Sequence, residues 1–209
     1  MVCAKQRAHT MHGLIFRTLE AFISDAFGPD RWAQAVALSD LPVTSFEAML
    51  QYDAAYFPIL LTACAQNLDR APSVILEDLG AYLITHQNHA SVRRLMRFGG
   101  DTFSELLHSL DDLPGRTRLA VSGLELPHVH VREPIPRNFT IHCTGTPTGF
   151  GHVLVGLLRA MADDYGTLAV LDHRGVRDGA EVIEVQVIET AFADDRGFSL
   201  AETEAAHLA

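Results

Sequence analysis

The chain has few cysteines and no long apolar run. Its three cysteines, Cys3, Cys64 and Cys143, are widely spaced and include no CxxC pair. This pattern excludes a disulfide framework and favours a reducing compartment. No window approaches the roughly 18 consecutive apolar residues of a membrane span, and the N-terminus lacks the apolar run of a signal peptide. We therefore expect a soluble, cytoplasmic protein.

Positive charge is also scarce. The 209 residues include 16 Lys and Arg against 26 Asp and Glu, which gives a formal net charge of −10. Nucleic acids and anionic membranes both attract proteins through lysine and arginine, so we expect neither as a partner. The sequence contains no GxSxG motif, no P-loop, and no GxGxxG between a strand and a helix. We therefore expect no enzymatic activity.

Hydrophobic side chains make up 48% of the chain, enough for a substantial core. In the first half, apolar residues recur at three- and four-residue steps and predict helices over about 13–27, 45–68, 73–95 and 103–113. Gly28-Pro29 and Pro114-Gly115 are expected to end the first and last of these.

The second half has the β-branched, alternating pattern of strands. Strands are expected over about 118–122, 128–131, 138–143, 167–171, 181–190 and 198–200, with one helix over about 148–165. The expected fold class is therefore α+β: a helical N-terminal part packed on a small antiparallel sheet that is crossed by one helix.

Several short segments also occur in a recognisable order. They are MHGLIF (11–16), Trp32, QYDAAYF (51–57), LGAYL (79–83), FGGDTFSELLHSLDDL (98–113) and GFGHVLVGLLRAM (149–161). Together they resemble the H-NOX family, the haem–nitric oxide/oxygen-binding domains. The resemblance implies one domain over residues 11–200, with a helical part (about 11–116) and a sheet part (about 117–200). Residues 1–10 would be an N-terminal extension and residues 201–209 a tail.

The resemblance implies a sensor that buries haem between these two parts and reports gas binding to a signalling partner. In the family an axial histidine follows an LDxL sequence, and a Tyr-x-Ser-x-Arg motif clamps the haem propionates. Here the axial position is Pro114, and the clamp falls on Cys143-Thr144-Gly145-Thr146-Pro147. Iron needs an imidazole lone pair, and buried carboxylates need a cation and hydroxyl donors. The standard haem site is therefore missing.

Other side chains offer alternative ligands. The candidates for iron are His86, His89, His142, His152 and Cys143. His128 and His130 alternate on one strand face, but zinc requires three or four ligands, so they form only a weak metal candidate. For each of these residues, an ordinary surface or hydrogen-bonded side chain is the default interpretation.

A pocket is the feature that the missing haem would leave behind. The candidate pocket residues, matched to the family residue by residue, are Ile15, Leu83, Gln87, Leu113, Pro114, Cys143 and Val153. Such residues could hold an apolar ligand that carries a polar group. They could also close up as core, because empty volume costs about 24 cal/mol per Å³.

These observations lead to one hypothesis and two alternatives. The hypothesis is a non-enzymatic, bacterial-type regulatory protein of the H-NOX fold that binds a hydrophobic organic ligand instead of conventional haem. It would signal through a separately encoded partner, such as a histidine kinase or a cyclic-nucleotide enzyme. The first alternative is a haem-dependent NO/O2 sensor with a non-standard axial ligand. The second is a ligand-free interaction module with a filled core.

Overall fold

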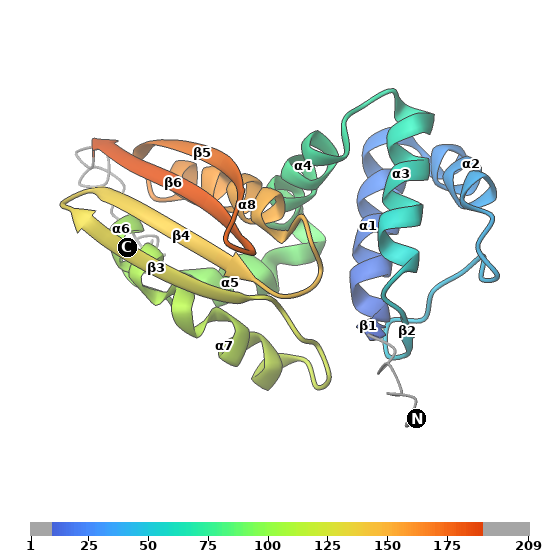
Figure 1. The fold of residues 1–209 in the computed structure, drawn as a ribbon, viewed down its shortest axis with the longest axis horizontal. Helices are drawn as coiled ribbons and strands as arrows, with labels where there is room; N and C mark the ends of the chain where they lie inside the picture. Colours follow the sequence, from blue (N-terminus) through green and yellow to red (C-terminus); the bar gives the residue numbers. More distant parts are fainter. Residues whose placement is uncertain (1–9, 190–209) are drawn as a thin grey trace, which may run out of the picture.

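The computed structural model describes residues 10–189, which form a helical lobe and a sheet lobe (Figure 1). In the helical lobe, three helices lie side by side and a short antiparallel strand pair lies at one end of them. Its elements are β1 (Thr10–His12), α1 (Gly13–Phe27), α2 (Pro29–Ser39), β2 (Gln51–Asp53) and α3 (Tyr56–Leu68).

Helix α4 (Pro72–Thr85) lies between the two lobes in Figure 1. The helices that follow it are a 3-10 turn, η1 (Gln87–His89), then α5 (Ala90–Arg97), α6 (Phe103–His108), a second 3-10 turn, η2 (Ser109–Asp112), and α7 (Leu113–Ala120). The sheet lobe is built from β3 (His128–Ile135), β4 (Asn138–Thr144), α8 (Phe150–Asp164), β5 (Leu168–Arg177) and β6 (Ala180–Glu189).

The main sheet is antiparallel, with the strand order β3-β4-β6-β5, and α8 packs across it (Figure 1). Along β4 the side chains of Phe139, Ile141 and Cys143 are buried while their neighbours are more exposed, as a strand with one covered face requires. The expected α+β class, with a helix crossing an antiparallel sheet, is confirmed.

Each lobe has its own hydrophobic core. In the helical lobe, the rings of Phe16 and Phe46 stack with their centroids 4.5 Å apart, and Phe57 meets Phe16 edge-on. In the sheet lobe, the buried face of α8 packs against β5 and β6, and its core also contains buried side chains of β4 and α6. Among the described residues, no helix is both long enough and apolar enough to cross a membrane.

Two glycines let α4 and α8 approach each other at backbone distance. A Cβ atom added at Gly80 would lie 2.0 Å from the carbonyl oxygen of Val153. A Cβ atom added at Gly156 would lie 1.8 Å from the carbonyl oxygen of Glu77. No side chain fits at either place, so the two helices cross at a contact that only glycine permits.

The structure corrects several of the expected elements in the first half. Helix α2 is not predicted by the apolar periodicity, although Trp32, Ala35 and Ser39 bury one face of it. The long helix expected over 45–68 is instead β2 followed by α3. Pro58 does not bend α3, because it lies in the first turn, where a helix does not use the backbone N–H.

The expected end of a helix at Pro114-Gly115 and the expected strand over 118–122 are both wrong. Pro114 lies in the first turn of α7, so it starts a helix rather than stopping one. The helix then runs to Ala120, through most of the segment expected as a strand.

Two further differences concern the middle and the end of the chain. The helix expected over 73–95 is divided by an extended residue, His86, into α4 and α5. Strand β5 continues to Arg177, and the turn of the β5–β6 hairpin is Asp178-Gly179, with positive φ angles of 52° and 79°. The strand expected over 198–200, the tail over 201–209 and residues 1–9 lie outside the described residues.

Candidate functional site

A cavity of about 570 Å³ lies between the helical lobe and the sheet lobe. Its volume falls within the range of small-molecule binding sites, about 300–1,000 Å³. The lining residues are Leu14, Ile15, Thr18, Phe57, Leu76, Leu79, Leu83, His89, Ser91, Val92, Arg94, Leu95, Met96, Phe98, Leu113, Thr117, Ala120, Val121, Leu124, Leu126, Pro147, Thr148, Gly149, Phe150, Val153 and Leu157.

Helix periodicity explains why the walls are apolar. Leu76, Leu79 and Leu83 lie at i, i+3 and i+7 on α4, so they share one face of that helix. Phe150, Val153 and Leu157 repeat the same spacing on α8, and they face the cavity from the other lobe. The cavity is therefore bounded by two apolar helix faces whose separation is fixed by the glycine contact between α4 and α8.

Helix α7 supplies a third wall. Leu113, Thr117 and Ala120 follow the i, i+4 and i+7 spacing of one face of α7, and they line the cavity together with Val121, which directly follows the helix. The Thr117 hydroxyl donates to the carbonyl oxygen of Leu113 at 2.9 Å. Its hydrogen-bonding capacity is thus used locally, and this wall offers no free polar donor.

Few polar groups reach the cavity, and none of its lining residues is Asp or Glu within residues 10–189. Among the described residues, the one permanently charged side chain in the lining is that of Arg94. The Nε2 atom of His89 is buried and has no hydrogen-bond partner among the described residues. Burial lowers the pKa of His89, and the neighbouring His86 lowers it further, so the ring is neutral near pH 7.

Four of the seven candidate pocket residues meet at this cavity: Ile15, Leu83, Leu113 and Val153. Their role as ligand contacts stays a prediction. The other three candidates, Gln87, Pro114 and Cys143, are not among its lining residues. Gln87 is exposed in η1, Pro114 is half-buried next to Leu113, and Cys143 lies in the core of the sheet lobe.

The candidate iron ligands are spread over the molecule, and His89 alone lines the cavity. The ring of His86 stacks on Tyr82, with centroids 4.7 Å apart, and its Nε2 atom lies 3.6 Å from Asp25. His142 is half-buried on β4, in register with His130 on β3.

The weak metal candidate is not supported by its surroundings. His128 and His130 are both exposed, and His130 Nδ1 lies 3.3 Å from the Asp111 carboxylate. Between residues 10 and 189, no group of three or more His, Cys, Asp and Glu side chains is arranged to hold a metal ion.

His152 belongs to a chain of contacts at the N-terminus of α8. Its ring stacks on His173, with centroids 3.8 Å apart, and its Nδ1 atom lies 3.2 Å from Glu77 on α4. His173 in turn lies 3.2 Å from the Glu181 carboxylate. That carboxylate accepts hydrogen bonds from the backbone N–H groups of Gly149, at 2.7 Å, and Gly151, at 2.9 Å. The N-terminus of α8 is therefore already occupied by a carboxylate of the chain itself.

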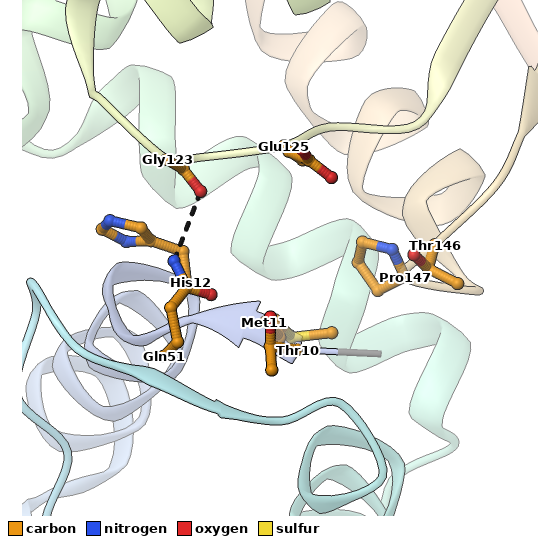
Figure 2. Close-up of a pocket in the computed structure, with 8 residues that line it drawn as sticks. All are labelled: Thr10, Met11, His12, Gln51, Gly123, Glu125, Thr146 and Pro147. Carbon is orange, nitrogen blue, oxygen red and sulfur yellow. Dashed lines mark hydrogen bonds between the residues drawn. The ribbon is translucent and has the colours of Figure 1, made fainter. Parts of the chain in front are cut away.

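A smaller, polar pocket of about 200 Å³ lies where β1 and β2 face two loops of the other lobe (Figure 2). Its lining residues are Thr10, Met11, His12, Gln51, Gly123, Glu125, Thr146 and Pro147. The Gln51 side chain donates to the carbonyl oxygen of Gly123 at 3.4 Å, which joins the two sides (Figure 2). Pro147 lines both this pocket and the larger cavity.

Cys64 and Cys143 are expected to be chemically inert in the folded protein. Burial raises the pKa of each thiol to about 12, so at pH 8 only about one molecule in ten thousand carries the reactive thiolate. In a Cys3→Ser variant, we expect Ellman's reagent to react with both thiols only at the rate of unfolding. A fast phase equal to one thiol per chain in native buffer would contradict this prediction, and full reaction in denaturant is the control.

Arg94 lines the cavity although the sequence did not predict it as a site residue. A signal for it was present, because Ser91 lies three residues before it and Phe98 four residues after it, which places all three along one face of α5. This face mixes one cation with apolar side chains, and only the packing of α5 against the cavity reveals that it faces inward.

Comparisons with known proteins agree on one family. Residues 12–173 match the Haem-NO-binding family. A soluble guanylate cyclase of Caenorhabditis elegans, gcy-31, is 20% identical over 154 residues, which is 74% of this chain and 22% of the relative. This chain therefore spans less than a quarter of that relative's length.

Solved structures with a similar fold are H-NOX proteins. The Fe(II) unliganded protein from K. algicida has a TM-score of 0.74 and 17% identity, with 86% of this chain and 97% of that chain covered. The S. oneidensis protein in the Fe(II)NO state has a TM-score of 0.71 and 15% identity, with 86% of this chain and 100% of that chain covered. At these identities, the likeness concerns the fold.

Proposed function

Because the chain belongs to the Haem-NO-binding (H-NOX) family of sensors, we propose that it is a non-enzymatic sensor that binds an organic molecule in place of haem. The ligand would lie in the cavity between α1, α4, α7 and α8. The single observation that carries this proposal is a cavity of about 570 Å³ with largely apolar walls. The filled core of an interaction module would leave no space of this size.

The residues at the family's positions do not fit haem. On the cavity face of α7, Leu113, Thr117 and Ala120 have no imidazole or thiolate, and Pro114 has no ligating atom. At the clamp, the Cys143 thiol is buried in the sheet lobe and its pKa is raised to about 12, so no thiolate is available. The backbone N–H groups of Gly149 and Gly151 already bind Glu181.

The ligand signal would reach a partner protein through the contact between α4 and α8. Both helices line the cavity; most buried side chains of α4 belong to the core of the helical lobe, and those of α8 belong to the core of the sheet lobe. The protein would have two conformations that differ in the distance between α4 and α8. A ligand that binds one of them more tightly would raise the population of that conformation. A histidine kinase or a cyclic-nucleotide enzyme remains the proposed partner, and the naming of one relative as a guanylate cyclase supports the second of these.

One observation favours a second candidate, a haem sensor with a different axial ligand. His89 is the one imidazole that lines the cavity, and its Nε2 atom has no partner among the described residues. A neutral ring with a free nitrogen is a competent iron ligand. In this alternative Arg94, the one cation in the lining, would hold a propionate.

A titration of the ligand-stripped protein with haem separates the two candidates. The proposed function predicts weak, non-stoichiometric binding and no His-ligated Soret band, because the walls lack the family's ligands. His89→Ala and His86→Ala serve as a matched pair, since both remove an imidazole but only His89 lines the cavity. The proposed function is wrong, and the second candidate is right, if the wild-type protein binds one His-ligated haem per chain, His89→Ala loses this haem and His86→Ala keeps it.

A further inference from the structure

Helix α5 has two different faces, and its arginines are divided between them. Arg93 and Arg97 both form ion pairs with Asp164. The Arg97 guanidinium contacts Asp164 Oδ2 at 2.8 Å and lies 4.0 Å from the centre of the Tyr165 ring. These two arginines therefore dock α5 onto the end of α8, where they share the carboxylate of Asp164.

The third arginine, Arg94, lies on the other face. With Ser91, Leu95 and Phe98 it follows the i, i+3, i+4 and i+7 spacing of one helix face, and all four line the cavity. Arg94 is exposed and forms no ion pair within residues 10–189. Its guanidinium is therefore available to pair with an anionic group that enters the cavity.

A second donor lies on the same side of the cavity. His89 directly precedes α5, and its buried Nε2 atom has no partner among the described residues. A buried polar atom that is left without a hydrogen bond costs free energy, so this nitrogen is expected to find its partner in whatever enters the cavity. Asp and Glu are both missing from the described lining, so the charge presented to a ligand is positive.

We infer that the ligand is an amphiphile with an apolar body and one carboxylate, which is bound by Arg94 and His89 at the α5 edge of the cavity. This inference rests on the proposed function and names the class of its ligand. A guanidinium and a carboxylate form a charge-assisted pair, and a ring N–H of His89 can donate a further hydrogen bond to the carboxylate. The apolar body would lie against Leu79, Leu83 and Val153 on α4 and α8.

The exposure of Phe98, at the end of α5, supports this orientation of the ligand. Phe98 is 84% exposed although it lines the cavity, and Arg94 lies one helical turn away from it. The α5 edge is therefore where the cavity meets water, and a carboxylate placed there keeps part of its hydration while the apolar body is buried.

The test compares dodecanoate with methyl dodecanoate, whose acyl chains are the same; the methyl group of the ester removes the negative charge of the head group. Binding is measured by isothermal titration calorimetry at pH 7, below the concentrations at which either probe aggregates. We expect the wild-type protein to bind dodecanoate about tenfold more tightly than the ester. Arg94→Gln is expected to remove this preference, and Arg93→Gln, on the same helix but paired with Asp164, is expected to keep it.

The outcomes separate the inference from the proposed function. Equal binding of the acid and the ester by the wild-type protein would overturn the carboxylate inference while the cavity keeps its proposed function. A preference for the acid that persists in Arg94→Gln would overturn the role of Arg94. If neither probe binds, the inference is wrong, and the proposed function fails with it if the purified protein also carries no small molecule.

Discussion

Replacing Gly156 with alanine is expected to lower the stability of the protein by about 3 kcal/mol, which corresponds to a fall in Tm of about 6–12 °C for a domain of this size. The added Cβ would lie 1.8 Å from the carbonyl oxygen of Glu77, which is a backbone atom of α4. The helices must therefore move apart. The gain in helix propensity from glycine to alanine, about 1 kcal/mol, is too small to offset this. Thermal unfolding followed by circular dichroism measures the effect.

Two further variants make this prediction specific to the contact between α4 and α8. Gly80→Ala faces the carbonyl oxygen of Val153 across the same contact, so the double variant should lose clearly less than the sum of the two single losses. Gly115→Ala on α7 meets no atom within 4 Å and should be neutral or slightly stabilising. A Tm for Gly156→Ala within 2 °C of the wild type, about the shift for less than 1 kcal/mol, would show that the helices do not cross at this distance.

Replacing Leu83 with tryptophan is expected to weaken ligand binding by about a hundredfold, the scale of overpacking a filled site. Leu83 lines the cavity but belongs to neither hydrophobic core, so a larger side chain extends into open space rather than into packed neighbours. For the same reason, the free energy of unfolding should stay unchanged or rise by up to about 1 kcal/mol. Calorimetric titration with dodecanoate and chemical denaturation measure the two quantities.

The matched control is Leu119→Trp. Leu119 lies on α7, is 91% exposed, and does not line the cavity, so the same substitution there should leave binding unchanged. If Leu83→Trp binds the ligand as tightly as the wild type does, the binding site lies elsewhere. If it unfolds the protein, the cavity is smaller in solution than in this structure.

The sequence predicted the fold class and the order of the main elements, because these depend on periodicity and on family-wide patterns. The helix over 13–27 and the strand over 138–143 have clear repeats, and the structure agrees with both within one residue. Pro114 shows where such reasoning fails. A proline can end the helix that precedes it, and it can also lie in the first turn of the helix that follows. Only the packing of Leu113 and Thr117 against the cavity decides which of these two positions Pro114 takes.

The site was predictable in part for the same reason. Ile15, Leu83, Leu113 and Val153 were identified through the family resemblance, and all four line one cavity. Arg94 was not identified, because its spacing does not distinguish a solvent-facing arginine from one at a cavity mouth. Its role depends on Asp164, far along the chain, which draws Arg93 and Arg97 to the opposite face of α5.

The polar contacts of the candidate histidines could not be predicted at all. His152 and His173 stack only because α8 and the β5–β6 hairpin meet at Glu181, and His86 stacks on a tyrosine one turn before it. These contacts involve histidines that the sequence analysis considered as ligands, and they show why composition alone overcounts the candidates. The tertiary structure assigns most of them to other neighbours.

The most direct test of the account is native mass spectrometry combined with an absorbance spectrum, on protein produced with excess haem precursor. The account predicts a colourless protein with no Soret band. Its native mass should exceed that of the chain by the mass of a small organic molecule that is released on denaturation. A one-to-one complex with the mass of haem and a His-ligated Soret band would contradict it.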